Sequence, residues 1–446
     1  MAAWNLPAEV VSWILQLASV LHRGVAWRLL PLLVGALFSQ GRQTVASWLR
    51  GGELGRDFRR YYYFLGSLGR NVKSVARVLF RLAVRVIQPG DRLLLALDDT
   101  PTKRNGPMVE GAGIHHNPTP GPADQKFLYG HVWVTLSWVV RHPWWGTIGL
   151  PLLAMLYVRQ KNLKSIAPWD KVKFQTKLEQ AASLVEWAAQ TLYGLGKTLW
   201  IVADGAYAKR PFLQRALAAG TIVISRLRKD AALWSMPETI EPGKRKRKRG
   251  RTRKYGKDKI SLAKRAGHRQ GWQSGDFVLY GKKVRKKYKT FLATYKPVGG
   301  VIRVVLVKEP DSWFAYCCTK PDASVQEILE AVADRAAIEQ NFHDLKEVHG
   351  AGKQQVRNYW ANIAAYHVTM WWHTLIELWA WDKPRRELTD RSASPWDDAS
   401  RRPSHADRRN ALRRECLKNE FQRVGPARDI PRKIRRLCDR LLKLVA

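Results

Sequence analysis

The spacing of apolar residues divides the chain into a helical part and a strand-rich part. Up to about residue 85, segments such as 11–21 and 72–87 carry apolar residues at helical spacing. Residues 92–100 instead form an apolar run that ends in two aspartates, and residues 132–140 and 148–158 have a similar apolar texture. Such runs are typical of buried strands, so the pattern predicts an N-terminal helical region followed by three strands that could form a meander.

A second α/β segment follows these strands. The pattern predicts a helix at about 171–195, a strand at 198–203 that ends at Asp204, a helix at about 210–219 and a strand at 221–226. Three strands, a helix, a strand, a helix and a strand is the order of an RNase H-like α/β domain. In that arrangement the acidic ends of the strands at Asp99 and Asp204 would lie side by side.

In the second half of the chain, the sequence pattern predicts a strand-rich segment followed by helices. Strand-like segments at 277–280, 290–295, 302–307 and 313–318 indicate a β-rich insertion, with the basic cluster 282–287 in a turn. Helices are expected at 325–348 and 363–381, followed by a polar linker at about 383–405. The predicted organisation is a helical N-terminal region (1–88), a first core part (89–228), a basic β-rich insertion (229–320), a second core part (321–382), and a linker with a basic helical tail (383–446). The arginines scattered through the N-terminal helices fit either a DNA-binding region or a charged cap on the core.

The charge of the chain indicates a polyanionic partner. Lys and Arg number 77 against 37 Asp and Glu, which gives a net charge of +40. A chain this basic repels itself unless a polyanion screens it, and nucleic acid is the obvious candidate. Disorder is not the explanation, because 46% of the residues are hydrophobic and 20 are Trp. One basic run has no apolar face and is expected to bind phosphates; it includes Lys244, Arg245, Lys246, Arg247, Lys248 and Arg249.

Cysteine spacing and the hydrophobic segments bear on the cellular compartment. The four cysteines contain no CxxC pair, which favours a reducing cytoplasm over a disulfide framework or a zinc site. No signal peptide is recognisable at the N-terminus. The apolar segment 363–381 contains two histidines and a glutamate, so a buried helix is expected rather than a membrane span. We therefore expect a cytoplasmic, nucleoid-associated protein with no membrane partner.

Two aspartates at strand ends are candidates for chemistry. Asp99 and Asp204 each end an apolar strand, where an acid is costly unless it is exposed or bound to a cation. Each taken alone could equally be a helix cap or a turn former. Asp98 competes with Asp99, because side chains alternate along a strand and only one of the two should face a site.

A third acid lies within a charged helical stripe. Arg335 and Lys346 lie eleven positions apart, close to three helical turns, and therefore share one face with Glu339 and His343. Taken alone, this stripe fits a salt-bridged surface. The alternative is a metal-binding acid flanked by cations that hold phosphates.

Together these motifs resemble the DDE transposases of insertion sequences, which have an RNase H-like core. More narrowly, Arg335-x3-Glu339-x6-Lys346 resembles the cut-and-paste group marked by a Tyr-x2-Arg-x3-Glu-x6-Lys signature. In that group the first metal-binding Asp directly precedes Thr, which favours Asp99 over Asp98. The resemblance covers roughly residues 90–350. One departure is Val332, which stands where the signature has Tyr.

The resemblance implies an activity and roles for these residues. Asp99, Asp204 and Glu339 would be catalytic and would hold two Mg²⁺ or Mn²⁺ ions, while Arg335 and Lys346 would grip terminal phosphates. Water would attack the transposon end, and the released 3′-OH would attack target DNA or first the opposite strand, giving a hairpin. Trp313 or Trp272 could steady a flipped base there. The implied partner is double-stranded DNA, namely terminal inverted repeats and target, and a homodimer is expected because two ends must be brought together.

Three other functions fit parts of the same pattern. A catalytically inactive or repurposed descendant would only bind DNA. An RNase H-like nuclease would cut without joining. A basic packaging protein would need none of the three acids.

Overall fold

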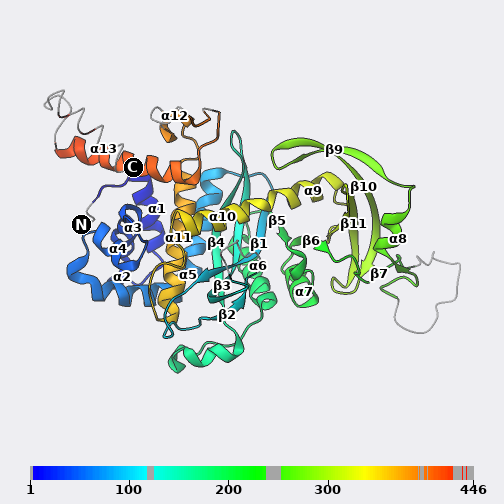
Figure 1. The fold of residues 1–446 in the computed structure, drawn as a ribbon, viewed down its shortest axis with the longest axis horizontal. Coiled ribbons are helices and arrows are strands. Elements are labelled where there is room, and N and C mark those ends of the chain that lie inside the picture. The colour runs from blue at the N-terminus through cyan, green and yellow to red at the C-terminus, as the bar shows by residue number, and fades with distance from the viewer. Residues whose placement is uncertain are drawn as a thin grey trace.

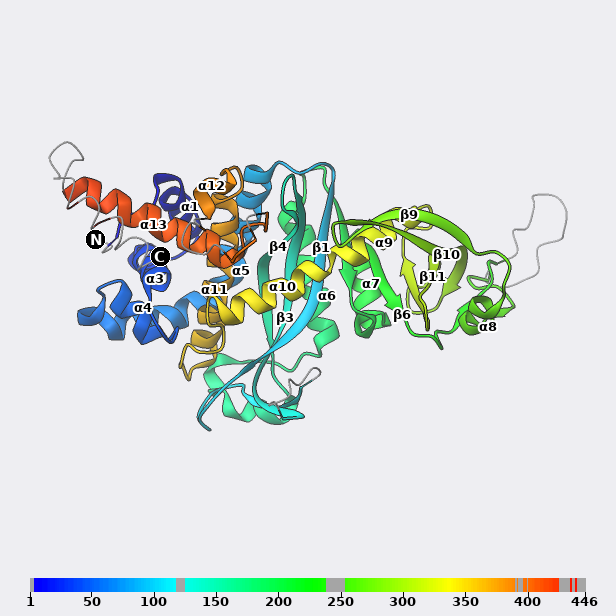
Figure 2. The ribbon, with the colours of Figure 1, turned by 45° about the horizontal axis from the view of Figure 1, so that its top comes forward.

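The computed structural model of the chain describes residues 4–117, 125–237, 253–389, 391, 396–398, 400–424, 434 and 438. A mixed sheet runs through the molecule, with one end covered by helices and the other drawn out into antiparallel strands (Figures 1 and 2). The helical elements at the N-terminal end are α1 (Ala8–Ala18), α2 (Arg23–Ala26), α3 (Leu29–Phe38), α4 (Val45–Gly51), the 3-10 turn η1 (Gly55–Asp57) and α5 (Phe58–Ile87).

The longest N-terminal helix, α5, packs against α11 (Tyr359–Trp379) from the distant end of the sequence. One face of α5 is buried, as its helical spacing of apolar residues predicts. The two helices approach closely at Gly69, where an added Cβ would lie 1.9 Å from the carbonyl oxygen of Trp360. Any larger residue at Gly69 would therefore push α5 away from α11.

One end of the sheet is an antiparallel meander with one additional strand. It contains β1 (Arg92–Lys103), β2 (Gly113–His116), β3 (Phe127–His142) and β4 (Gly146–Tyr157). Strand β3 pairs with both β1 and β4, which confirms the predicted meander, and β2 also pairs with β3. Along β1 the apolar residues alternate between two hydrophobic clusters, so consecutive side chains face opposite sides of the sheet.

The next α/β segment adds parallel strands beside β1. It contains the 3-10 turns η2 (Gln160–Ser165) and η3 (Pro168–Asp170), α6 (Lys177–Leu192), β5 (Thr198–Ala203), the 3-10 turn η4 (Gly205–Tyr207), α7 (Arg210–Ala218) and β6 (Ile222–Leu227). Helix α6 begins later than predicted, because Thr176 and Glu179 form a capping box there. Strand β5 runs parallel to β1 with Ala203 opposite Leu97, so the acidic ends of the two strands lie side by side as predicted.

Antiparallel strands extend the same sheet beyond β6. They are β7 (Leu233–Trp234), β8 (Lys259–Ile260), β9 (Gln273–Leu279), β10 (Lys282–Tyr295), β11 (Gly300–Lys308) and β12 (Trp313–Cys318), with α8 (Leu262–Gly267) between β8 and β9. The prediction that the basic cluster 282–287 forms a turn is wrong, because it lies in β10 and pairs with β9. The turn falls at Tyr280 and Gly281, which have φ of +54° and +76°. This end of β10 is largely exposed, so it has no apolar alternation by which the sequence could reveal a strand.

The remaining elements are helical. They are α9 (Val325–Asp334), α10 (Ala336–Glu347), α11, α12 (Arg385–Leu388) and α13 (His405–Val424). The single helix predicted over 325–348 is divided at Arg335, where Ile338 N donates to the Arg335 carbonyl oxygen in a tight i→i+3 turn. Helix α11 is buried along nearly its whole length, which confirms the expected core helix. Among the described residues, no helix is both long and apolar enough to cross a membrane.

Candidate active site

The two aspartates of β1 face opposite sides of the sheet. Asp98 points to the side of Leu94 and Ala96, which pack in the cluster that α9 and α10 complete. Its Oδ2 accepts a hydrogen bond from Arg335 Nη1 at 2.6 Å. Its Oδ1 accepts from the backbone N–H of Asp99 at 2.8 Å. Asp98 is therefore tied to the helix region that carries the third acid.

Asp99 is tied to a different set of residues. Its Oδ2 accepts from Lys177 Nζ at 2.6 Å, and its Oδ1 accepts from the hydroxyl of Tyr207 at 2.9 Å. Lys177 is the first residue of α6, and Tyr207 is the last residue of the turn that follows Asp204. Both carboxylate oxygens of Asp99 thus have a partner, of which one is a cation and the other a buried phenol.

Asp204 follows β5 directly and begins the η4 turn. Its side chain accepts from the backbone N–H of Ala206 at 3.1 Å, while its carbonyl oxygen accepts from Ser225 Oγ at 3.1 Å. Because β1 and β5 are adjacent and parallel, Asp204 lies next to the β1 aspartates at the same edge. The cap bond fixes the side chain locally and leaves carboxylate lone pairs for other partners.

Glu339 lies on α10, one turn after Arg335. Its side chain is 62% exposed, and its Oε1 accepts from Arg335 Nη2 at 3.0 Å. Arg335 therefore bridges two carboxylates, Asp98 of β1 and Glu339 of α10, with two separate nitrogens. A guanidinium suits this position because its planar fork presents several donors at fixed angles.

Negative charge is crowded at this edge of the sheet. Burial, with a smaller contribution from the nearby Asp99 and Asp204 carboxylates, raises the pKa of Asp98 to about 6 in spite of the opposing effect of Arg335. Burial and the same carboxylates raise the pKa of Tyr207 well above its usual value, so its hydroxyl keeps its proton and donates. A cation bound beside these acids would stabilise their ionised forms, so the crowding of carboxylates favours cation binding at this edge.

The other predicted site residues occupy varied positions. Lys346 is half-buried, and burial lowers the pKa of its ammonium group. His343 is exposed, and its Nδ1 lies 3.2 Å from Asp344 Oδ1. Trp313 is half-buried at the start of β12, with the Lys229 ammonium 5.2 Å from its ring centroid. The predicted phosphate contacts Lys244, Arg245, Lys246, Arg247, Lys248 and Arg249 lie outside the described residues.

Sequence reasoning missed two partners in this site. Lys177 and Tyr207 contact Asp99, but neither stands in a recognisable motif. In the sequence, Lys177 looks like any residue in the first turn of a helix, and Tyr207 looks like any aromatic residue of the core. Position 332, where the resemblance would place a phosphate-binding Tyr, holds a valine that packs against the hydrophobic cluster behind α9.

A mixed α/β sheet with acids directly after the paired segment of two adjacent parallel strands, and a further acid on a neighbouring helix, is compatible with the fold of RNase H-like nucleases. The family model described as DDE superfamily endonuclease matches residues 16–276, more than half of the chain, and the chain belongs to this family. Enzymes of this superfamily are transposase-like nucleases that act on DNA and depend on divalent metal ions. The match includes Asp99 and Asp204 and ends before Glu339. No protein of curated function matches the chain.

Proposed function

We propose that the protein is a DNA transposase that cuts the ends of its own element and joins them to target DNA. The observation that supports this most directly is the Arg335 bridge, which links the third acid, Glu339, to the acid pair of β1. In this proposal residues 89–228 and 321–382 form an RNase H-like core, residues 229–320 a β-rich insertion, and the two ends of the chain helical regions.

The donor set suits hard divalent cations such as Mg²⁺ or Mn²⁺, which prefer carboxylate oxygens. Asp99, Asp204 and Glu339 would hold the ions, and the raised pKa of Asp98 supports a demand for positive charge here. When bound, a pair of such ions would stabilise charge on the scissile phosphate and lower the pKa of the attacking water. Arg335 and Lys177 meet part of that demand through their ion pairs with the β1 aspartates.

The β1 ligand has two candidates with different contacts. The family resemblance implies Asp99, which would have to release Lys177 and Tyr207 in order to bind an ion. The geometry supports Asp98 as well, because it lies on the α10 side of the sheet and shares Arg335 with Glu339. Substituting each aspartate separately distinguishes the two assignments.

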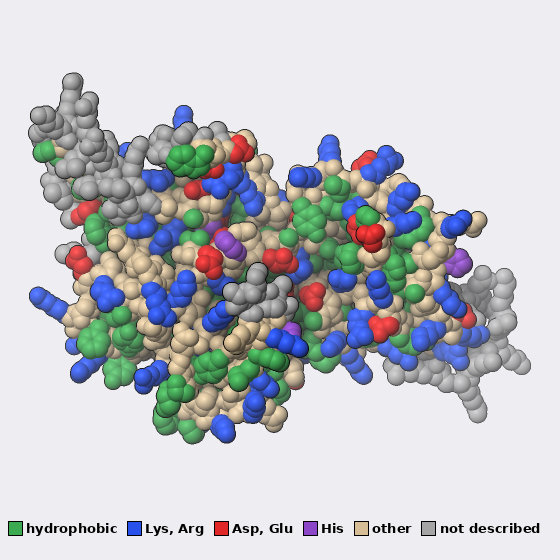
Figure 3. All heavy atoms as spheres, in the orientation of Figure 1, with side chains coloured by type: hydrophobic (Ala, Val, Ile, Leu, Met, Phe, Trp, Pro, Cys, Tyr) green, Lys and Arg blue, Asp and Glu red, His purple; other side chains and the backbone are tan. Residues whose placement is uncertain are grey.

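The chain's own cations would position the DNA. Arg335, once released from Asp98 and Glu339, presents a planar fork that matches a phosphate, and Lys346 lies three turns further along the same helical region. The run from Lys244 to Arg249 and the half-buried Trp313 would add contacts to backbone and bases. Lys and Arg side chains are spread over the whole face drawn in Figure 3, which fits a long DNA path. Two such chains would pair two transposon ends.

A cleavage and joining assay tests the proposal. Purified protein is mixed with DNA that carries the inverted repeats flanking its own gene, with Mg²⁺, and with pre-cut ends in a parallel reaction. We expect cut ends and joined products from the wild type. Asp204→Asn, Glu339→Gln and one of Asp98→Asn or Asp99→Asn should lose about a hundredfold to a thousandfold in rate, the scale of removing transition-state charge stabilisation.

The matched control is Glu309→Gln, because Glu309 is an acid paired with Lys286 in the extended antiparallel part of the sheet. It should cut and join like the wild type. Binding without any cutting under these conditions would contradict the enzyme proposal. Cutting with no joining of pre-cut ends would identify a nuclease without transposase activity.

A further inference from the structure

The hairpin formed by β9 and β10 has one covered face and one open face. On the covered face, Phe277 of β9 and Tyr288 of β10 pack in the hydrophobic cluster that α9 completes. The alternate residues point to the other side of the sheet, away from α9. Helix α8 covers that second face only as far as Lys289, whose ammonium group donates to the carbonyl oxygens of Arg265 and His268. Beyond Lys289 this second face is exposed and forms the open face of the hairpin.

The open face is basic. It carries Lys283, Arg285 and Lys287, which occupy every second position of β10 and are all exposed. Side chains on one face of a strand repeat about every 7 Å, so the three cations form a regular row. The facing residues of β9 are Val278, Asp276 and Ser274. The one acid among them lies 3.9 Å from Arg285, in a pair whose side chains are both more than 70% exposed. The row is therefore only weakly neutralised.

The two faces of β10 differ in how their lysines are neutralised. On the covered face, the ammonium group of Lys286 lies 2.8 Å from both carboxylate oxygens of Glu309. On the open face, Lys283 and Lys287 have no ion-pair partner within the part of the chain that the structure describes. Lys287 also stands directly opposite Lys308 of β11, which is exposed as well. Like charges directly opposite each other destabilise a sheet, so a bound polyanion would relieve this repulsion.

The form of the hairpin matches one groove of DNA. Its two strands make an antiparallel ribbon over seven paired positions, from Lys282 opposite Leu279 to Tyr288 opposite Gln273. The major groove of B-form DNA is about 12 Å wide and admits a two-stranded β-ribbon, and phosphates line both of its walls. A single polyanion of this shape would meet the whole row of cations at once.

We propose that the open face of the β9–β10 hairpin lies in the major groove of duplex DNA, where Lys283, Arg285 and Lys287 contact phosphates. Arg285 leaves Asp276 at small cost, because their pair is exposed. This face is on the side of the sheet opposite the cluster that α9 and α10 complete, so it is separate from the contacts of Arg335 with Asp98 and Glu339. The proposal takes from the family only that the substrate is DNA, and it depends on no step of cleavage or joining.

Two matched double variants of the full chain test the face. Lys283→Gln with Lys287→Gln removes two lysines from the open face. Lys282→Gln with Lys286→Gln removes two lysines of the same strand from the covered face. Affinity for a DNA duplex is measured by fluorescence anisotropy over a series of salt concentrations, without metal ions. All four side chains lie at the surface or are half-buried, so both variants are expected to fold.

The open-face variant should bind the duplex about thirtyfold more weakly than the wild type at about 0.15 M salt, because each phosphate contact contributes a factor of about 5 there. The slope of log affinity against log salt should become shallower by about 2. The covered-face variant should stay within about threefold of the wild type with an unchanged slope, because it loses no phosphate contact. Equal losses in the two variants, or no loss in the open-face variant, would overturn the proposal.

Two further probes test the groove. Duplex RNA of the same length has a major groove too deep and narrow for side chains to read, and DNA with glucosylated hydroxymethylcytosine has a blocked one. On both probes, the difference between the wild type and the open-face variant should shrink to less than about threefold, because the ribbon cannot enter. A thirtyfold difference that persists on both would mean attraction to charge without entry into the groove, and would overturn the proposal. No measurement here requires cutting, so this contact and the transposase proposal can fail separately.

Discussion

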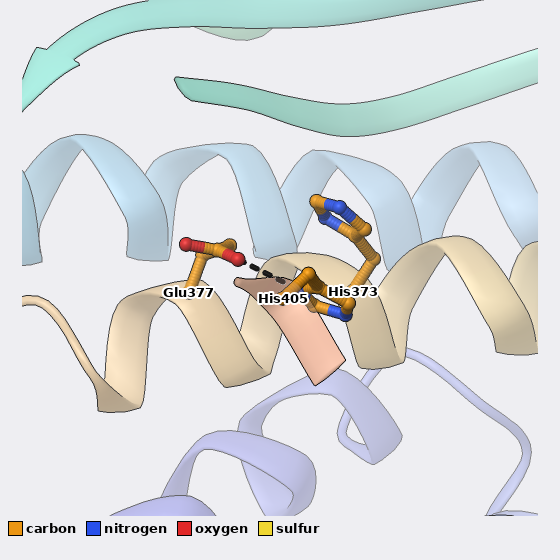
Figure 4. Close-up of side chains that lie close together, drawn as sticks. All are labelled: His373, Glu377 and His405. Carbon is orange, nitrogen blue, oxygen red and sulfur yellow. Dashed lines mark hydrogen bonds and ion pairs between the residues drawn. The ribbon is translucent and has the colours of Figure 1, made fainter. Parts of the chain in front are cut away.

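Helix α10 and its flanking residues separate two acidic clusters that are built in opposite ways. On one side, Glu339 is largely exposed and contacts one cation, Arg335, through one hydrogen bond. On the other side, Glu377 is 1% exposed and accepts bonds from His405 (Figure 4) and from Arg408. The open cluster can exchange its partners for metal or phosphate at small cost. The closed cluster cannot lose a partner without leaving a buried charge uncompensated.

This contrast separates two uses of the same chemistry. A site that must bind and release DNA needs carboxylates whose protein partners are weak and replaceable. A site that holds elements together needs carboxylates that are dehydrated and fully bonded. The pKa directions differ between the clusters: burial raises the pKa of Asp98, whereas in the closed cluster the bonded neighbours of Glu377 and Asp344 lower their pKa values in spite of burial.

The largest effect is expected from Glu377→Gln. It removes the charge that neutralises the buried Arg408, and breaking a buried pair from one side costs about 3–5 kcal/mol of unfolding free energy. Urea denaturation measures the loss. Glu339→Gln serves as the matched control, since its exposed pair should change the unfolding free energy by less than about 1 kcal/mol. Equal losses in the two variants would remove the distinction between the clusters.

The pH dependence of stability should have opposite signs in the two clusters. His405 has a folded pKa of about 4 against 6.5 for a free histidine, so its contribution is full above pH 6.5 and is lost as the pH falls toward 4. Asp98 has a folded pKa of about 6 against 3.8, so its contribution is full below pH 3.8 and is lost as the pH rises through 6. Unfolding free energies of wild type and Asp98→Asn, measured from pH 4 to 7, should therefore shift in the variant's favour as the pH rises. A difference that is constant with pH would contradict a raised pKa for Asp98.

The smallest effect is expected from Arg335→Lys. A lysine keeps the charge but cannot reach Asp98 and Glu339 with two separate fixed nitrogens, so one contact is lost. The change in unfolding free energy should stay below about 1 kcal/mol, because the pair with Glu339 is exposed. Cleavage should fall more than stability does, which rate measurements beside urea denaturation would show. A loss of stability as large as that of Glu377→Gln would mean that the open cluster also holds the fold together.

The sequence predicts the strands that carry the acids better than it predicts which way the acids face. The apolar runs before Asp99 and Asp204 are strands β1 and β5, and their pairing places the acidic ends together. Alternation along β1 shows that Asp98 and Asp99 face opposite sides of the sheet. Only the packing of α9, α10 and α6 against the sheet shows that Asp98 contacts Arg335 and that Asp99 contacts Lys177. That information comes from contacts between distant segments, which periodicity does not contain.

The closed cluster was beyond sequence reasoning for the same reason. His373 and Glu377 are visible as a helical pair, and they served in the sequence to argue for a buried helix rather than a membrane span. His405 falls at the end of what reads as a polar linker, and nothing in that stretch indicates that it returns to α11. The basic segment 282–287 illustrates a second limit of sequence patterns. It lies in a strand, but an exposed strand need not alternate apolar and polar residues, so the pattern did not predict one.

The Arg335 bridge also has a consequence for how the protein is made. Asp98 and Arg335 are 237 positions apart in sequence, and the antiparallel strands β7 to β12 are synthesised between them. A chain emerging at about 5–20 residues per second completes β1 well before α10 exists, so the open cluster is assembled late. Closing so long a loop is also slow compared with forming local helices. A nascent chain can therefore acquire its basic N-terminal helices, and the DNA affinity expected of them, before it acquires the means to cut.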